Sequence, residues 1–241
     1  MDPVIIIVAT TLFAAAFLQS ATGFGMALVL MAILPMVITV EEASAFTSLG
    51  SMIVTVFVIL ANRSGLSFRD AGPLVLGMCI GIPVGFFGLR MLDGEFIIRI
   101  LGLVLIIITV AEFLQNRIKR LAIPEKSGTA FGFVGGVLAG SFNVGGPPLV
   151  VYAYSRGWAK VTSVAVLQTA FLAGGIIRNG FVAGTGEFTP ALLKMIAISM
   201  PTAVLAVWLG KKTLDRMPRD QLKKVVFGMI FLIGLRYLIL G

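Results

Sequence analysis

One stretch of the chain reads Gly140-Ser141-Phe142-Asn143-Val144-Gly145-Gly146-Pro147-Pro148, and it interrupts an apolar segment that runs from 127 to 155. Glycine and proline break helices, and non-helical backbone at membrane depth is tolerated only where protein buries it or where it lines a cavity. The segment is also too long for one simple crossing of a ~30 Å hydrocarbon core. This stretch therefore predicts a broken helical hairpin in a membrane protein.

A second broken segment runs from 4 to 39, and near its middle it reads Gln19-Ser20-Ala21-Thr22-Gly23-Phe24-Gly25. The two broken segments align when the sequence is shifted by 120 residues, which places Gly25 on Gly145 and, further along, Phe68 on Phe188. Apolar segments then follow in the same order in both halves of the chain. Self-similarity of this kind indicates a tandem duplication.

Six further apolar segments of about 20 residues are each long enough to cross the bilayer as a helix. The predicted first repeat, residues 1–120, contains the hairpin at 4–39 and spans at 43–61, 71–90 and 96–115. The predicted second repeat, residues 121–241, contains the hairpin at 127–155 and spans at 161–182, 189–210 and 221–240. We therefore predict an all-helical polytopic membrane protein of two repeats, each a broken or re-entrant helical hairpin plus three transmembrane helices.

The composition agrees with a lipid environment. Hydrophobic residues make up 58% of the chain and charged residues 12%, which is half of the ~25% charge of a soluble domain. The absence of histidine excludes Ser-His-Asp and Cys-His catalysis as well as histidine metal sites. A single cysteine, Cys79, excludes an internal disulfide. We therefore expect no catalytic residues, no metal site and no cofactor, and we disfavour an intramembrane enzyme.

The 19 basic residues lie mostly in short loops, which is typical of a membrane topology signal rather than of a nucleic-acid patch. If all eight apolar segments cross, one side of the membrane holds eight basic residues and the other holds ten, and Arg178 lies inside its span. If the two broken segments are re-entrant, fourteen lie on one side and four on the other, namely Arg90, Arg99, Lys194 and Arg236. The positive-inside rule favours the second topology, with the fourteen in the cytoplasm, both termini outside and the two repeats inverted.

A re-entrant hairpin leaves the first N–H groups of its second arm unpaired at the tip, where they and the helix dipole favour an anion. Pro147 suits the first turn of such an arm, because that position needs no N–H. Two tips related by the repeat would meet near the bilayer midplane. The alternative is that the glycines only let helices pack closely. The predicted substrate-binding residues of the two breaks are Gln19, Ser20, Thr22, Gly23, Gly25, Ser141, Asn143, Gly145, Gly146 and Pro147.

Polar residues of two other segments could complete this site. One face of the second segment carries Ser44, Ser48, Ser51 and Thr55. Ser48 aligns with Gln168 under the 120-residue shift, so we include both residues, together with Arg178, among the predicted substrate-binding residues. Two alternatives stay open, because Ser48 can bond backbone within its own helix and Arg178 can snorkel to the interface instead of contacting the anion or holding a gate.

The duplicated motifs resemble the TauE/SafE family of sulfite exporters, on Ala21-Thr22-Gly23-Phe24-Gly25 in one half and on the stretch at 140–148 in the other. The resemblance covers roughly residues 4–240. It implies an oxyanion as substrate, namely sulfite, sulfoacetate or a related organosulfonate, moved commonly outward. The first copy has Met26 and Ala27 where the second has Gly146 and Pro147, so the site need not be symmetric.

We therefore expect a carrier in the bacterial inner membrane that moves small sulfur oxyanions outward. The carrier would hold the anion near the midplane, between the two hairpin tips. An inside-negative potential favours anion exit by about 2.3 kcal/mol per charge per 100 mV, so uniport or weak coupling suffices. The expected partners are a small anion and the lipid bilayer, not nucleic acid, and the sequence permits a homodimer without indicating one. The alternatives are an anion channel of the same architecture and a membrane assembly protein without transport.

Overall fold

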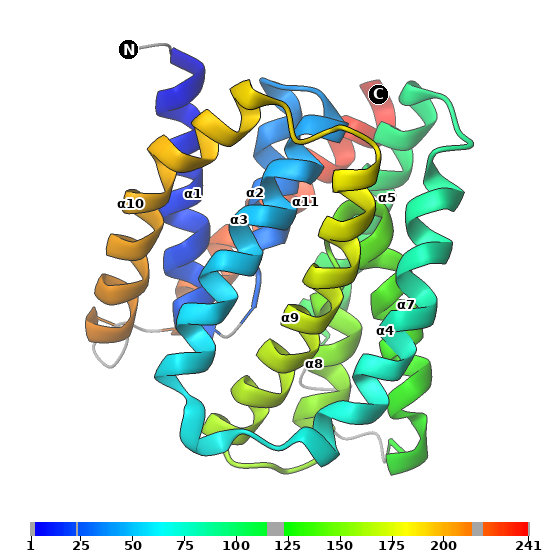
Figure 1. The fold of residues 1–241 in the computed structure, drawn as a ribbon, viewed down its shortest axis with the longest axis vertical. Coiled ribbons are helices and arrows are strands. Elements are labelled where there is room, and N and C mark those ends of the chain that lie inside the picture. Colours follow the sequence, from blue (N-terminus) through cyan, green and yellow to red (C-terminus); the bar gives the residue numbers. More distant parts are fainter. Residues whose placement is uncertain (1–2, 23, 115–122, 214–218, 241) are drawn as a thin grey trace. The chain divides into compact units, whose positions relative to one another are not determined.

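The computed structural model describes residues 3–22, 24–114, 123–213 and 219–240, and this part of the chain is helical without a strand. The first half forms α1 (Pro3–Thr22), α2 (Met26–Ile33), α3 (Val40–Ala61), α4 (Phe68–Leu89) and α5 (Gly94–Phe113). The second half forms α7 (Gly128–Phe142), α8 (Gly146–Ser155), α9 (Lys160–Gly184), α10 (Pro190–Thr213) and α11 (Arg219–Leu240). Short 3-10 turns lie at Leu34–Met36, Arg63–Gly65 and Glu125–Ser127. The prediction of an all-helical fold is confirmed (Figure 1).

Six helices among the described residues are long and apolar enough to cross a membrane, namely α1, α3, α4, α5, α9 and α10. Five of them coincide with predicted single spans, and α11 covers the remaining predicted span at 221–240. The first arm of the predicted hairpin at 4–39 is α1, whose 20 residues suffice for a crossing by themselves. The membrane-spanning character is therefore confirmed, while a re-entrant path for the two hairpins stays a prediction.

The chain folds into two compact units, each built from both halves of the sequence. Unit 1 consists of Met1–Gly50, Leu92–Phe113 and Glu187–Gly241. Unit 2 consists of Ser51–Met91 and Leu114–Gly186. Packing thus groups segments that are distant in sequence. This grouping neither requires nor contradicts two sequence repeats with a boundary at residue 120, so the repeats stay a prediction.

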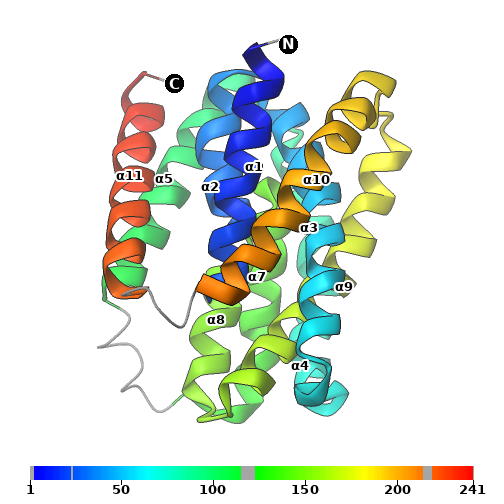
Figure 2. The same ribbon diagram turned by 90° about the vertical axis from the view of Figure 1, so that its left-hand side faces the viewer.

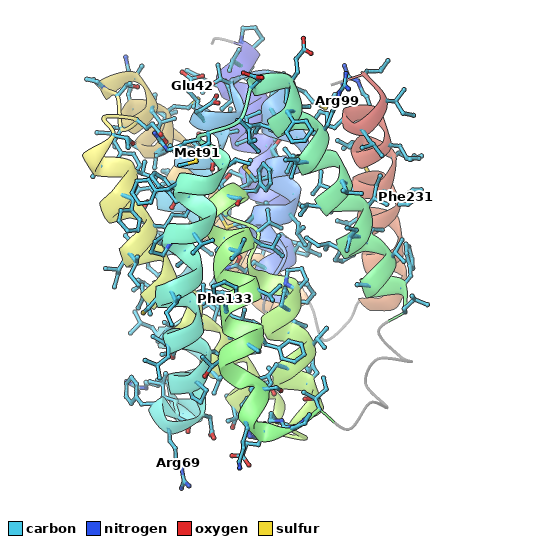
Figure 3. All side chains as sticks on the ribbon, turned by 90° about the vertical axis from the view of Figure 1, so that its right-hand side faces the viewer. Glu42, Arg69, Met91, Arg99, Phe133 and Phe231 are labelled. Carbon is cyan, nitrogen blue, oxygen red and sulfur yellow. The ribbon has the colours of Figure 1, made fainter. Side chains whose placement is uncertain are left out.

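The core of unit 2 is the pair α4 and α7, which run in parallel side by side (Figure 1). Their facing residues are glycines four apart, Gly77, Gly81 and Gly85 on α4 and Gly132, Gly136 and Gly140 on α7. A Cβ on Gly85 would overlap the Val137 carbonyl oxygen, and a Cβ on Gly140 would overlap that of Ile82. Figure 3 shows Arg69 and Met91 at opposite ends of α4, with Phe133 on α7 between them. Small residues let the two backbones touch, which stabilises helix pairs in lipid through van der Waals contact.

Unit 1 contains a corresponding parallel pair, α1 and α10 (Figure 2). The Ser20 hydroxyl donates to the Val207 carbonyl oxygen at 2.9 Å, and the Thr202 hydroxyl donates to that of Ala9 at 3.3 Å. The second pair of unit 1, α5 and α11, packs in antiparallel fashion. The Tyr237 hydroxyl of α11 donates to the Ala32 carbonyl oxygen of α2 at 2.8 Å, which fixes the short second arm of the first hairpin.

One hydrogen bond recurs in both units. The Ser141 hydroxyl of α7 donates to the Gly85 carbonyl oxygen of α4 at 3.1 Å, as Ser20 does to Val207. The two donors are 121 residues apart in the sequence and the two acceptors are 122 apart. These separations lie within two residues of the 120-residue shift by which the two halves of the sequence align, so the recurring bond supports the predicted duplication.

Candidate substrate site

The break of the second hairpin begins where α7 ends. Gly140 and Ser141 belong to the last turn of α7, and the helix ends at Phe142. Asn143 then has φ 59° and ψ 20°, in the left-handed region that asparagine adopts more readily than most residues. Its backbone N–H donates to the Ala139 carbonyl oxygen at 2.8 Å. The break is therefore a helix C-terminus closed by asparagine.

The side chain of Asn143 leaves the hairpin and contacts α3. Its Nδ2 donates to the Ser51 hydroxyl at 3.1 Å, and both residues belong to unit 2. Ser51 lies on the polar face that the sequence places on this segment, although it is not among the predicted site residues. Its position one helical turn from Ser48 is the signal that could have included it.

Arg178 reaches the same break from α9. Its Nε donates to the Ala139 carbonyl oxygen at 2.8 Å, and its side chain is 2% exposed. The same carbonyl accepts the backbone N–H of Asn143, so the two predicted site residues meet at one atom. A positive charge at the C-terminal end of α7 is stabilised by the helix dipole. Burial excludes the alternative in which this guanidinium extends to the surface of the unit.

The second arm of the hairpin, α8, begins at Gly146 with Pro147 in its first turn, as predicted. Pro147 and Pro148 have no N–H, so Gly146 alone supplies an amide donor among the first three residues of α8. Gly145 serves close packing, because a Cβ there would overlap the Gly135 carbonyl oxygen of α7. The amide donors expected at this tip are therefore few, and the side chains of Asn143 and Arg178 are the principal donors.

The first hairpin breaks between α1 and α2 in unit 1. Gln19, Ser20 and Thr22 belong to α1 rather than to the break, and Gly23 lies outside the described residues. Gly25 has φ 104°, a conformation that favours glycine. The first turn of α2 contains Met26, Ala27 and Leu28, none of which is proline, so each carries an N–H. This break therefore offers backbone donors.

Three further predicted polar site residues are buried. The exposed fraction is 5% for Gln19, 1% for Ser48 and 0% for Gln168. Ser48 belongs to unit 1 and Gln168 to unit 2. Ser20 and Ser141 donate to carbonyl oxygens of neighbouring helices. Among the described residues, no three His, Cys, Asp or Glu side chains gather as metal ligands. What unit 2 does bring together is Asn143, Arg178 and Ser51.

A family model described as "Sulfite exporter TauE/SafE" matches residues 7–237 of the chain. The chain belongs to the TauE/SafE family. A curated relative named "Probable sulfite/organosulfonate exporter TauE", from Cupriavidus necator, is 26% identical over 227 residues, which cover 92% of this chain and 88% of the relative. No solved structure gives a significant match.

Family membership confirms the resemblance seen in the broken segments and agrees with the six membrane-crossing helices. The protein is a multi-pass membrane transporter of a sulfur-anion family, not an enzyme. The donors at the hairpin break, buried Arg178 and half-buried Asn143, therefore belong to a transporter.

Proposed function

We propose that this TauE/SafE member exports a small sulfur oxyanion, sulfite or an organosulfonate such as sulfoacetate, and that Asn143 and Arg178 bind it. The observation that carries the proposal is that a buried guanidinium and the partly buried Asn143 lie at one helix break, where Arg178 Nε and the Asn143 backbone N–H share the Ala139 carbonyl oxygen. The relative from Cupriavidus necator bears a name that includes both kinds of substrate, which supports this substrate class.

The chemistry of the two side chains suits an oxyanion. A guanidinium has five N–H donors in a planar fork that matches two oxygens of one anion, and it stays charged. Arg178 directs Nε toward the Ala139 carbonyl oxygen, which fixes the orientation of that fork. A charged residue within a membrane segment marks a substrate pathway more often than a packing role. The Asn143 side-chain amide adds a neutral donor at the same helix break.

Further parts of the proposal come from charge and from the repeat. The positive-inside rule supports the bacterial inner membrane with both termini outside, although part of the counted charge falls at 115–122 and 214–218, outside the described residues. An inside-negative potential drives an anion outward, which supports export by uniport. A contribution of the first hairpin tip and of Ser48 and Gln168 to the same site, and a homodimer, stay predictions.

The test is voltage-clamped flux of sulfite and of sulfoacetate in proteoliposomes, comparing wild type with Asn143→Ala and Arg178→Gln. We expect saturable flux in wild type, a loss of about tenfold for Asn143→Ala, as a lost hydrogen bond implies, and a larger loss for Arg178→Gln. Asn62→Ala is the matched control, because the Asn62 amide only bonds the Val58 carbonyl oxygen of its own helix. It should transport normally.

Three results would contradict this assignment. Non-saturating conductance far above carrier turnover would indicate a channel instead. Flux that strictly requires a proton or sodium gradient at clamped voltage would exclude uniport. Normal flux in both site variants, with folded protein, would remove Asn143 and Arg178 from the site.

A further inference from the structure

A single aromatic ring in unit 2 contacts two guanidinium groups. Phe86 of α4 is 4% exposed, and Cζ of Arg90 lies 4.4 Å from its ring centroid. Cζ of Arg178 lies 5.9 Å from the same centroid. Both distances fall within the ~6 Å range of cation–π attraction. Phe86 therefore contacts both the buried arginine of the hairpin break and a second arginine.

The second arginine is at the end of its helix and in contact with solvent. Arg90 follows the last residue of α4 and is exposed. Its Nη2 donates to the Thr185 hydroxyl at 3.3 Å, at the C-terminal end of α9. Figure 3 shows Met91, the next residue, at this end of α4. Arg178, which is buried, and Arg90, which is exposed, thus contact the same ring from α9 and from the end of α4.

The Phe86 ring is held by other aromatic side chains. Phe181 of α9 stacks on Phe86 with centroids 5.5 Å apart and an interplanar angle of 27°. Phe87 meets Phe86 edge-on at 5.4 Å and meets Phe181 at 5.3 Å. A cluster of this kind excludes water and has a defined resting position. It can separate the break from solvent until the Phe86 ring changes rotamer.

Electrostatics favours an anion along this path. The two guanidinium groups carry the same charge, and their Cζ atoms lie 4.4 Å and 5.9 Å from the Phe86 ring centroid. Positive charges bordered by low-dielectric side chains focus the field and raise the local concentration of anions. An anion that leaves Arg178 therefore meets a second cation as soon as it passes the Phe86 ring.

We infer that Arg178, Phe86 and Arg90 form the passage between the hairpin break and the membrane side of Arg90, with the Phe86 ring as its gate. This inference rests on the proposed function, since it needs a sulfur oxyanion bound at Arg178. Charge counting assigns the side of Arg90 to the outside, so the passage is the exit in export.

The test compares right-side-out with inverted membrane vesicles and uses labelled sulfoacetate as the probe. Arg90→Gln is expected to lower kcat/KM about tenfold for substrate applied on the Arg90 side, because steering is lost. On the opposite side the change should be under twofold. The effect should shrink from about 0.01 M to about 1 M salt, as the Debye length falls from ~30 Å to ~3 Å. The matched control is Arg99→Gln, an exposed arginine of α5 assigned to the same membrane side, which should behave as wild type.

A second variant tests the gate itself. Phe86→Ala should raise non-saturating leak of the probe several-fold, and Phe86→Leu, which keeps most of the side-chain volume but no ring, should raise it less. Because Arg90 is exposed, Arg90→Gln should fold, and its flux tests the passage even if Phe86→Ala does not fold. If Arg90→Gln and Arg99→Gln have equal kcat/KM on both membrane sides, the passage is overturned. Saturable flux of the wild type would still uphold the proposed function in that case. Absence of saturable wild-type flux would overturn both.

Discussion

Unit 1 and unit 2 each hold one broken hairpin against a helix from the other half of the sequence. In both units a serine of the first arm donates to a carbonyl oxygen of that helix. In unit 2, glycines on three successive turns of α4 face glycines on three successive turns of α7, so that these two backbones touch. The α4–α7 pair of unit 2 is therefore held by direct backbone contact, and the α1–α10 pair of unit 1 is held with more side-chain contact.

The breaks themselves differ in the donors that they offer. In unit 1 the second arm begins with three residues that carry N–H groups, and Gly25 at the break has no side chain. In unit 2 two prolines remove the amides of the first turn, while Asn143 and Arg178 supply side-chain donors. A duplicated architecture can thus present backbone donors from one copy and side-chain donors from the other.

The largest expected effect concerns the tight pair in unit 2. Gly85→Ala places a Cβ onto the Val137 carbonyl oxygen, and two packed backbones cannot move apart cheaply. We expect a loss of about 3 kcal/mol of stability, the upper end of ordinary overpacking, seen as a lower midpoint of thermal unfolding in detergent. Gly88→Ala is the matched control, since its Cβ meets nothing within 4 Å. Equal midpoints for the two variants would show that backbone contact does not distinguish unit 2.

The second prediction, of intermediate size, distinguishes the backbone conformation at the two breaks from the side-chain donor of Asn143. Asn143→Gly keeps the left-handed conformation but removes the Nδ2 bond to Ser51, so we expect a stability loss of about 0.5–1.5 kcal/mol and flux lower by up to about tenfold. Asn143→Ala loses the same flux and, in addition, about 1 kcal/mol, because alanine is strained there. Gly25→Ala should show the strain without a lost side-chain donor. Normal flux in Asn143→Gly would mean that the asparagine only closes α7.

The smallest effect tests the bond that the two units share. Ser20→Ala and Ser141→Ala should each cost about 0.5–1.5 kcal/mol, the net value of one hydrogen bond, and should cost the same within that range. Thermal unfolding of both variants measures the loss, and flux measures any role in binding. A loss of transport in only one of them, at equal stability, would place that serine in contact with the substrate.

Much of the fold could be predicted, because membrane helices follow from length and apolarity alone. The spans at 43–61, 71–90 and 189–210 coincide with α3, α4 and α10 within a few residues. The break at 140–148 was also placed correctly, and Pro147 lies in the first turn that suits it. The roles within the break were less predictable, because serine at 141 and glycine at 145 serve packing as readily as binding.

The sequence by itself determined that this chain spans a membrane, breaks two of its apolar segments and belongs with the sulfite exporters. These properties depend on composition and on motifs within single segments. Only the tertiary structure decided that Arg178 is buried against the end of α7 and that Phe86 contacts both Arg178 and Arg90. Such contacts join helices distant in sequence, and their partners are set by packing, which no local pattern records.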